Sequence, residues 1–132
     1  MTLPTLPAHR LAVRPQARQW LIDALWADEA VGILGGEPKS CKSFLALQMA
    51  VSVAGGVPCL GRFAPARTGR VLLYAAEDAL HVVRQRLAGI AAAVGRDLAD
   101  LDIHVITCPS LRLTLAEQYF SWCAFRQRAP RR

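Results

Sequence analysis

The stretch GGEPKSCKSF, residues 35–44, departs by one residue from the pattern of a phosphate-binding loop. That pattern is Gly, four residues of any kind, Gly, Lys and then Ser or Thr. Gly36, Lys42 and Ser43 stand in the expected positions, whereas Cys41 replaces the second glycine. The surrounding sequence therefore has to decide between a nucleotide site and an ordinary loop that contains a lysine.

The residues on either side of the loop favour a nucleotide site. The apolar run AVGILGG, residues 30–36, predicts a buried strand that enters a tight loop. The run KSFLALQMAVSVAGG, residues 42–56, predicts an apolar helix that ends at two glycines. A phosphate-binding loop needs this setting between a strand and a helix. The alternative, a structural turn before a core helix, stays open at this point.

Each part of the loop has a predicted task in binding ATP. Backbone N–H groups would surround the phosphates, and the start of the following helix adds the positive end of its dipole. Lys42 would reach the β- and γ-phosphates, and the Ser43 hydroxyl would ligate Mg²⁺. The predicted binding residues are Gly36, Glu37, Pro38, Lys39, Ser40, Cys41, Lys42, Ser43 and Phe44.

The cysteine at position 41 is compatible with this prediction if the backbone there is right-handed. In the left-handed region a non-glycine residue costs about 1–2 kcal/mol. We expect the right-handed conformation for Cys41, because the helix should begin at about this residue. We also expect its thiol to be buried and inert rather than sensitive to oxidation.

A second motif, VLLYAAED at residues 71–78, places two acids directly after a predicted strand, RVLLYAA. The carboxyl ends of parallel strands face the ligand crevice of an open sheet, so Glu77 can lie near the γ-phosphate. A carboxylate there can orient and deprotonate the attacking water. We assign catalysis to Glu77 and Lys42 and a helix cap to Asp78. The alternative, that both acids merely cap the next helix, stays open.

The order of the predicted elements indicates an α/β fold. After Asp78 apolar residues recur at three- and four-residue steps until Gly95, which predicts a helix, and IHVIT at 103–107 predicts a third strand. Strands that alternate with helices are typical of a three-layer parallel sheet. A short helix is also expected over 15–25. Arg84 and Arg86 are expected on a solvated helix face, and the alternative, that they face a phosphate or a partner, stays open.

Composition narrows the class of protein. The 132 residues allow one small domain, and the net charge of +6 favours acidic partners such as nucleotides or nucleic acid. The four cysteines are scattered, as expected of reduced thiols in a cytoplasmic protein. The uncharged stretch 44–61 contains Gly55, Gly56 and Pro58, which would break a spanning helix, so we expect no membrane association.

At this point a family resemblance is apparent. GGEPKSCKSFLALQMAVSVAGGVPCLGRF followed by GRVLLYAAEDALHVVRQRL resembles the RecA-like AAA-family ATPases related to plasmid RepA replicative helicases. The resemblance covers about residues 21–109. It implies a RecA-like P-loop core, ATP with Mg²⁺, and often a ring of identical subunits on DNA. It also carries the catalytic glutamate onto Glu77, and non-glycine residues before the P-loop lysine are familiar in that family.

The chain departs from this family after Pro109. The family's core includes four apolar residues that end in the Walker B Asp, and no such strand follows in the sequence. We therefore expect an incomplete core with an irregular leader at 1–14, the N-terminal part of a RecA-like ATPase domain at 15–109, and a basic aromatic tail at 110–132. We expect the tail to be the out-of-frame end of a truncated gene. The alternative, that its aromatic and arginine side chains bind nucleic acid or a membrane surface, stays open.

These observations predict an ATP-binding P-loop ATPase of the RecA/RepA helicase type, linked to DNA in its full-length form. With Walker B missing, we expect weak ATP binding, turnover close to background, and self-association through bare strand edges. Two alternatives stay open. One is a non-catalytic module that binds nucleotide or DNA, and the other is a P-loop kinase for a small molecule.

Overall fold

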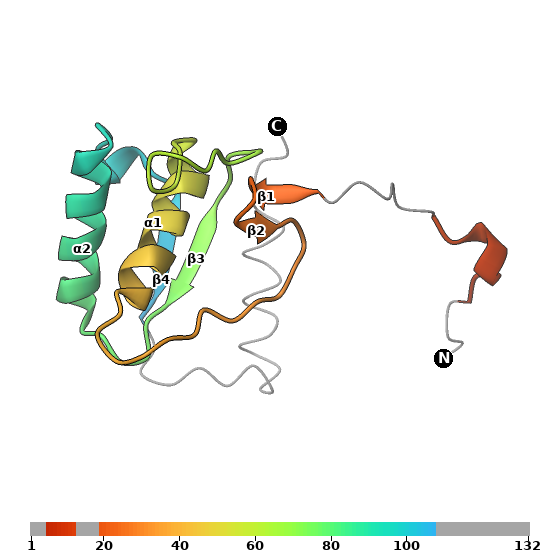
Figure 1. The fold of residues 1–132 in the computed structure, drawn as a ribbon, viewed down its shortest axis with the longest axis horizontal. Coiled ribbons are helices and arrows are strands. Elements are labelled where there is room, and N and C mark those ends of the chain that lie inside the picture. The colour runs from red at the N-terminus through yellow and green to blue at the C-terminus, as the bar shows by residue number, and fades with distance from the viewer. Residues whose placement is uncertain (1–4, 13–18, 108–132) are drawn as a thin grey trace.

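The computed structural model describes residues 5–12 and 19–107, which form two α-helices, four short strands and two 3₁₀ turns (Figure 1). The predicted tail at 110–132 lies outside the described residues. In chain order the elements are η1 (Ala8–Arg10), β1 (Trp20–Ile22), β2 (Trp26–Ala27), α1 (Lys42–Gly55), β3 (Val71–Tyr74), α2 (Leu80–Ala93), η2 (Leu98–Asp100) and β4 (Ile103–Ile106).

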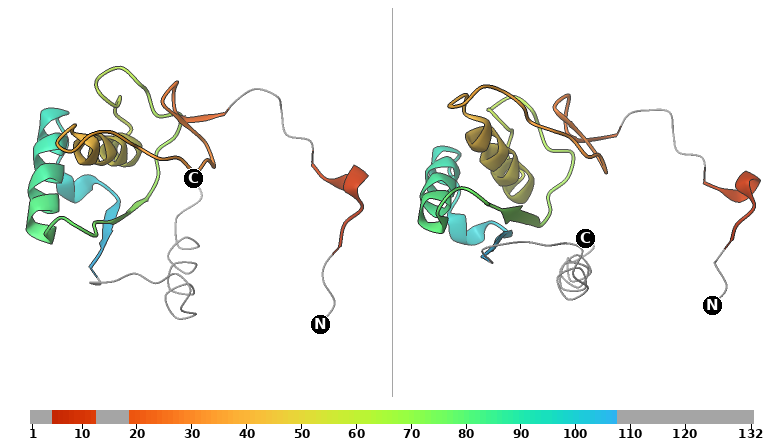
Figure 2. Two further views of the ribbon diagram at one scale, coloured as in Figure 1. Left: turned by 60° about the horizontal axis from the view of Figure 1, so that its bottom comes forward. Right: turned by 90° about the horizontal axis from the view of Figure 1, so that it is seen from below.

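Strands β3 and β4 form a parallel pair, and α2 is the crossover between them. The register runs from Val71 opposite Ile103 to Tyr74 opposite Ile106. Helices α1 and α2 both lie on the same side of this pair (Figure 2). The predicted strands at 70–76 and 103–107 are therefore confirmed. The three-layer sheet is not seen in the described ranges, where β3 and β4 form one two-stranded sheet and β1 and β2 another.

The core lies where the two helices meet the parallel strands. Apolar residues recur at three- and four-residue steps on α2, as predicted, and this spacing places them on one helix face. The buried cluster consists of Leu47, Val51, Val83, Leu87, Ile90, Ala91 and Leu101, with Leu73 of β3 and Ile103 of β4 packed against it. This packing fixes the position of both helices on the strands.

Helix α1 ends as the sequence predicts. Gly56 adopts a left-handed conformation, with φ of 64°, and its N–H donates to the carbonyl of Ser52. A Cβ at this position would approach Cγ2 of Thr68 to 2.7 Å, so both backbone and space require glycine. No helix in the described ranges is long and apolar enough to cross a bilayer.

The helix expected over 15–25 is wrong for residues 19–25, which form an antiparallel hairpin instead. Strand β1 pairs with β2, and Ile22 is almost fully buried and bridges to Pro65. The N–H of Ala66 also donates to the carbonyl of Leu21 at 2.9 Å. Pairing with the distant loop at 57–69 therefore outweighs the helical spacing of the local apolar residues.

The buried strand expected over residues 30–36 is also wrong. The structure shows an extended, exposed segment there, with Val31 fully exposed and Ile33 95% exposed. A strand requires a neighbour to pair with its N–H and C=O groups. Among the described residues, β3 pairs with β4 and no ladder reaches this segment. Its apolar residues therefore stay outside the core.

The backbone at Cys41 corrects another expectation. Cys41 precedes the first residue of α1 and adopts the left-handed conformation, with φ of 61° and ψ of 20°. The right-handed conformation expected from the sequence is wrong, because the chain must turn sharply from the loop into the helix. A non-glycine residue in this region costs about 1–2 kcal/mol. The cysteine therefore strains the loop.

An ion pair joins β3 and β4 at their amino ends. Nε of Arg70 donates to both carboxylate oxygens of Asp102 at 3.0 Å, and Nε2 of His104 lies 2.8 Å from the same carboxylate. The hydrogen bond from Arg70, more than the interaction with His104, lowers the pKa of Asp102 below its ordinary value. The pair helps to hold the parallel register.

We predict that Cys41→Gly raises the free energy of unfolding by about 0.5–1 kcal/mol, since relief of left-handed strain exceeds the added flexibility of the unfolded chain. Urea denaturation of the two proteins provides the measurement. Cys41→Ala is the matched control, because it removes the sulfur and keeps the Cβ. An equal gain in Cys41→Ala would show that the thiol, and not the backbone, causes the effect.

A second prediction concerns the ion pair of Asp102, which is partly exposed. Asp102→Asn should lower the free energy of unfolding at pH 7 by about 0.5–1 kcal/mol. The folded-state pKa is lowered, so this stabilisation is present above the ordinary value of 3.8 and is lost as the pH falls below it. The urea midpoints of the two proteins should therefore differ at neutral pH and converge at acidic pH. A difference that grows in acid would contradict the prediction.

Candidate functional site

The site lies at the end of the fold where both parallel strands end and both helices begin. Figure 1 shows the starts of α1 and α2 beside the arrowheads of β3 and β4. Parallel strands joined by a crossover helix place their carboxyl ends at one edge, where ligands commonly bind. The loop at 36–41 and the segment at 75–79, which follows β3, both reach this edge.

The loop at 36–41 curls around the ammonium group of Lys42. Nζ of Lys42 donates to the carbonyls of Gly36 at 2.9 Å and Glu37 at 2.6 Å, and lies 3.4 Å from Oγ of Ser40. A Cβ on Gly36 would lie 2.9 Å from Oγ of Ser40, so glycine allows this close approach. The lysine thus organises the loop that the sequence predicted to bind phosphate.

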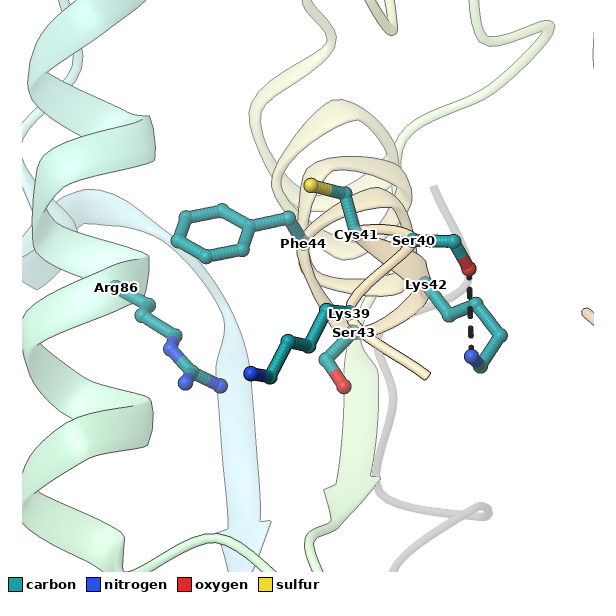
Figure 3. A pocket seen from close by; sticks show the side chains of 7 residues that line it. All are labelled: Lys39, Ser40, Cys41, Lys42, Ser43, Phe44 and Arg86. Carbon is teal, nitrogen blue, oxygen red and sulfur yellow. Dashed lines mark hydrogen bonds between the residues drawn. The ribbon is translucent and has the colours of Figure 1, made fainter. Parts of the chain in front are cut away.

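A pocket of about 240 Å³ opens beside the loop and the first turn of α1. It is lined by Lys39, Ser40, Cys41, Lys42, Ser43, Phe44 and Arg86 (Figure 3). The N–H groups of the first helical turn have no intrahelical acceptor and carry the positive end of the helix dipole. The lining therefore offers three cationic side chains, two hydroxyl groups and backbone donors, which suits a phosphate chain.

A second pocket, of about 310 Å³, lies along the carboxyl end of β3. Ser43 lines both pockets, and Glu77 and Asp78 line the second. The structure therefore brings the acids of the AAED segment to the helix start that carries Lys42 and Ser43. This placement agrees with the sequence argument, which derived it from the geometry of parallel strands.

Asp78 does not cap helix α2, which corrects the role predicted for it. The residue before α2 is Ala79, and its side chain makes no capping hydrogen bond to this helix end. The carboxylate of Asp78 instead accepts a hydrogen bond from Nη1 of Arg86 at 2.8 Å. The acid follows β3 too early to reach the first helical N–H groups, and it faces the arginine two turns along α2.

Arg86 is the residue of the site that sequence reasoning placed wrongly. It was expected on a solvated face, but its side chain is only 29% exposed and lines the pocket of the loop. Its guanidinium carbon lies 5.3 Å from the ring centroid of Phe44, the geometry of a cation–π contact. The i to i+8 spacing from Asp78 and the contact across two helices left no signal in the sequence.

The other predicted residues divide into three groups. Gly36 and Glu37 line neither pocket and instead contribute carbonyl groups to Lys42. Pro38 is exposed and lines neither pocket. Cys41 is exposed, so the expectation of a buried thiol is wrong.

The donor set of the site fits a small hard cation held together with a nucleotide. Mg²⁺ prefers oxygen ligands and usually keeps substrate phosphates and waters in its shell. The Ser43 hydroxyl and the Glu77 carboxylate supply oxygen on the protein side of one pocket. In the part of the chain that the structure describes, no group of three or more His, Cys, Asp or Glu could hold a metal by itself.

Comparison with known families agrees with the geometry of the loop. A sequence profile described as AAA domain matches residues 1–119. Neither the curated proteins nor the solved structures give a significant match. The matched range includes the phosphate-type loop, the helix after it and the AAED segment, and it supports a nucleotide-binding function of the ATPase type. The chain belongs to the AAA domain family of P-loop ATPases.

Proposed function

We propose that this chain binds ATP with Mg²⁺ at the loop 36–43 and that Glu77 directs hydrolysis of the terminal phosphate. We further propose that it is related to the RecA-like ATPases of the plasmid RepA helicase type. The observation that carries the proposal is the sharing of Ser43 by two pockets, one lined by Lys42 and the other by Glu77. A phosphate chain held by Lys42 would end beside the Glu77 carboxylate.

Lys42 would hold the phosphates by exchanging partners. Its ammonium donates to two loop carbonyls in the structure, and a phosphate oxygen is a stronger, charged acceptor than either carbonyl. The flexible four-carbon side chain allows the group to turn to the β- and γ-phosphates without a change of backbone. The N–H groups of Lys42, Ser43 and Phe44 would add hydrogen bonds at the helix start.

Glu77 would act on water at the far end of the phosphate chain. The residue is exposed at the edge of the second pocket, so a water molecule can reach its carboxylate. A carboxylate in this place orients the water and accepts its proton as the oxygen attacks phosphorus. Ser43 would hold Mg²⁺ together with the phosphates, and the ion would supply positive charge to the phosphate oxygens.

A second candidate, nucleotide binding without turnover, is favoured by one observation. In the described part of the chain, Glu77 and Asp78 are the carboxylates that line the two pockets, and Asp78 is paired with Arg86. A single remaining carboxylate would have to serve the water and the metal shell together. The two candidates predict the same ATP affinity and differ in phosphate release.

The proposal also includes a functional link to DNA. It is supported by the net charge of +6 and by the resemblance to plasmid RepA helicases. Addition of single-stranded DNA should then raise the rate of phosphate release. Unchanged rates with DNA at several salt concentrations would argue against this link and leave ATP binding untouched.

We predict that Lys42→Ala weakens ATP binding by about 2–4 kcal/mol, because it removes the charge that meets the β- and γ-phosphates. Isothermal titration calorimetry with ATP and Mg²⁺ gives the affinity directly. Arg96→Ala is the matched control, since Arg96 is an exposed cation beyond the other end of α2. Equal affinity in Lys42→Ala and the parent protein would contradict the assignment of the loop.

For a parent protein that hydrolyses ATP above background, we predict that Glu77→Gln slows hydrolysis by about 10²–10⁴-fold while ATP affinity changes little, because the amide cannot accept the water's proton. Phosphate release is measured with the Lys42→Ala protein as background. Asp23→Asn, which removes an exposed carboxylate after β1, is the matched control. Turnover in Glu77→Gln within a few fold of the parent would remove Glu77 from the mechanism. Parent turnover no higher than background would favour the binding-only candidate.

A further inference from the structure

The pocket beside the loop is bounded by cations on two sides. Lys42 turns its ammonium to the carbonyls of Gly36 and Glu37. Lys39 and Arg86 extend toward one another on the other side of the loop, near the Ser43 hydroxyl (Figure 3). Two like charges that approach each other in a pocket repel unless an anion lies between them. The arrangement therefore points to a second anionic contact, separate from that of Lys42.

The guanidinium of Arg86 is held in place before any ligand arrives. The Phe44 ring packs against it at 5.3 Å, and Asp78 accepts a hydrogen bond from Nη1 at 2.8 Å. A guanidinium has five N–H donors in a planar fork, so donors remain for a second acceptor. Its partial burial, at 29% exposure of the side chain, reduces the screening of its charge by water.

We propose that Arg86 and Lys39 bind the phosphate chain of the bound nucleotide from the side opposite Lys42. Arg86 is thus a further substrate-positioning residue, brought to the loop by helix α2. This inference rests on the proposed function, because it assigns a second contact to the same phosphate chain. It adds a residue 44 positions beyond Lys42 in the chain, outside the loop motif.

The chemistry of the pocket favours phosphate over the base or sugar as the partner of Arg86. The described residues that line it supply three cations, two serine hydroxyls and the N–H groups of the helix start, and none of them is a carboxylate. The aromatic ring of the pocket belongs to Phe44, and Arg86 already packs against it. A base would thus compete with the guanidinium for the Phe44 ring, whereas a phosphate would meet donors and positive charge from both sides.

The ion pair with Asp78 joins this contact to the catalytic segment. Asp78 directly follows Glu77 and binds the same guanidinium that faces the phosphates. The position of the phosphate chain and the position of Glu77 thus depend on one side chain. Through its contact with Asp78, Arg86 would thus set the position of the Glu77 carboxylate relative to the terminal phosphate.

The experiment compares two ligands in four variants. Arg86→Gln and Lys39→Gln remove the proposed contacts, Arg86→Lys keeps the charge without the planar fork, and Arg84→Gln is the control. Arg84 lies on the same helix, carries the same charge, is exposed and lines neither pocket. Calorimetry gives the affinity of each protein for ATP and for inorganic tripolyphosphate, which has no base or sugar.

We expect Arg86→Gln and Lys39→Gln to lower the affinity for both ligands by about 5- to 20-fold, the range of a partly exposed charge-assisted contact. Arg86→Lys should lose less, and Arg84→Gln should match the parent. Thermal melting of each protein without ligand identifies any variant that does not fold. If Arg86→Gln fails that test, Arg86→Lys and Lys39→Gln decide the question.

Three outcomes would overturn the inference. The first is a loss of affinity for ATP without a loss for tripolyphosphate, which would assign Arg86 to the base or sugar. The second is an equal loss in Arg84→Gln, which would show a general effect of net charge. The third is unchanged affinity in the Arg86 and Lys39 variants, with Lys42→Ala still defective, which leaves the proposed function intact. A parent protein that binds neither ligand would overturn the proposed function itself.

Discussion

The parallel pairing of β3 and β4 is the constraint on which the site depends. Two strands that run in the same direction require a crossover, and α2 supplies it with its apolar face in the core that it shares with α1 and the strands. Because α1 packs on the same side, its start falls at the edge where both strands end. The phosphate-type loop and the AAED segment meet there without any direct pairing between them. The chemistry of the site thus follows from the direction of four hydrogen-bonded residue pairs.

Elements whose structure is set by their own residues could be predicted from the sequence, whereas elements that depend on pairing with distant segments could not. Helix α2 carries its own apolar spacing and the end of α1 its own glycines, so both helices were predicted nearly to the residue. The hairpin at 20–27 depends on pairing of β1 with a loop some 40 residues later, which no local pattern reveals. The run at 30–36 has the composition of a strand, yet composition cannot supply a neighbour.

The distinction between local patterns and contacts of distant segments applies to the site as well. The residues from Gly36 to Ser43 form a continuous motif, and its spacing singled out Lys42 and Ser43 at the start of the helix. Arg86 belongs to no motif, since it meets Phe44 and Asp78 only after two helices pack together. Its charge was visible in the sequence, but the face of the helix on which it acts was not. Side chains that arrive from a second element escape sequence reasoning even when they face the ligand.

Backbone strain at Cys41, which adopts the left-handed conformation, affects the free energy of unfolding and the affinity for phosphate differently. The backbone at Cys41 is strained while Lys42 donates to the loop carbonyls. In the proposed binding mode Lys42 changes its partners without a change of backbone, so the strain at Cys41 would be the same with phosphate bound. A cost that is equal in the free and bound states cancels from the affinity and remains in the free energy of unfolding. Cysteine in place of glycine at this position therefore lowers the free energy of unfolding without lowering the affinity for phosphate. This separation is a physical reason why a P-loop can keep a cysteine where the pattern has glycine.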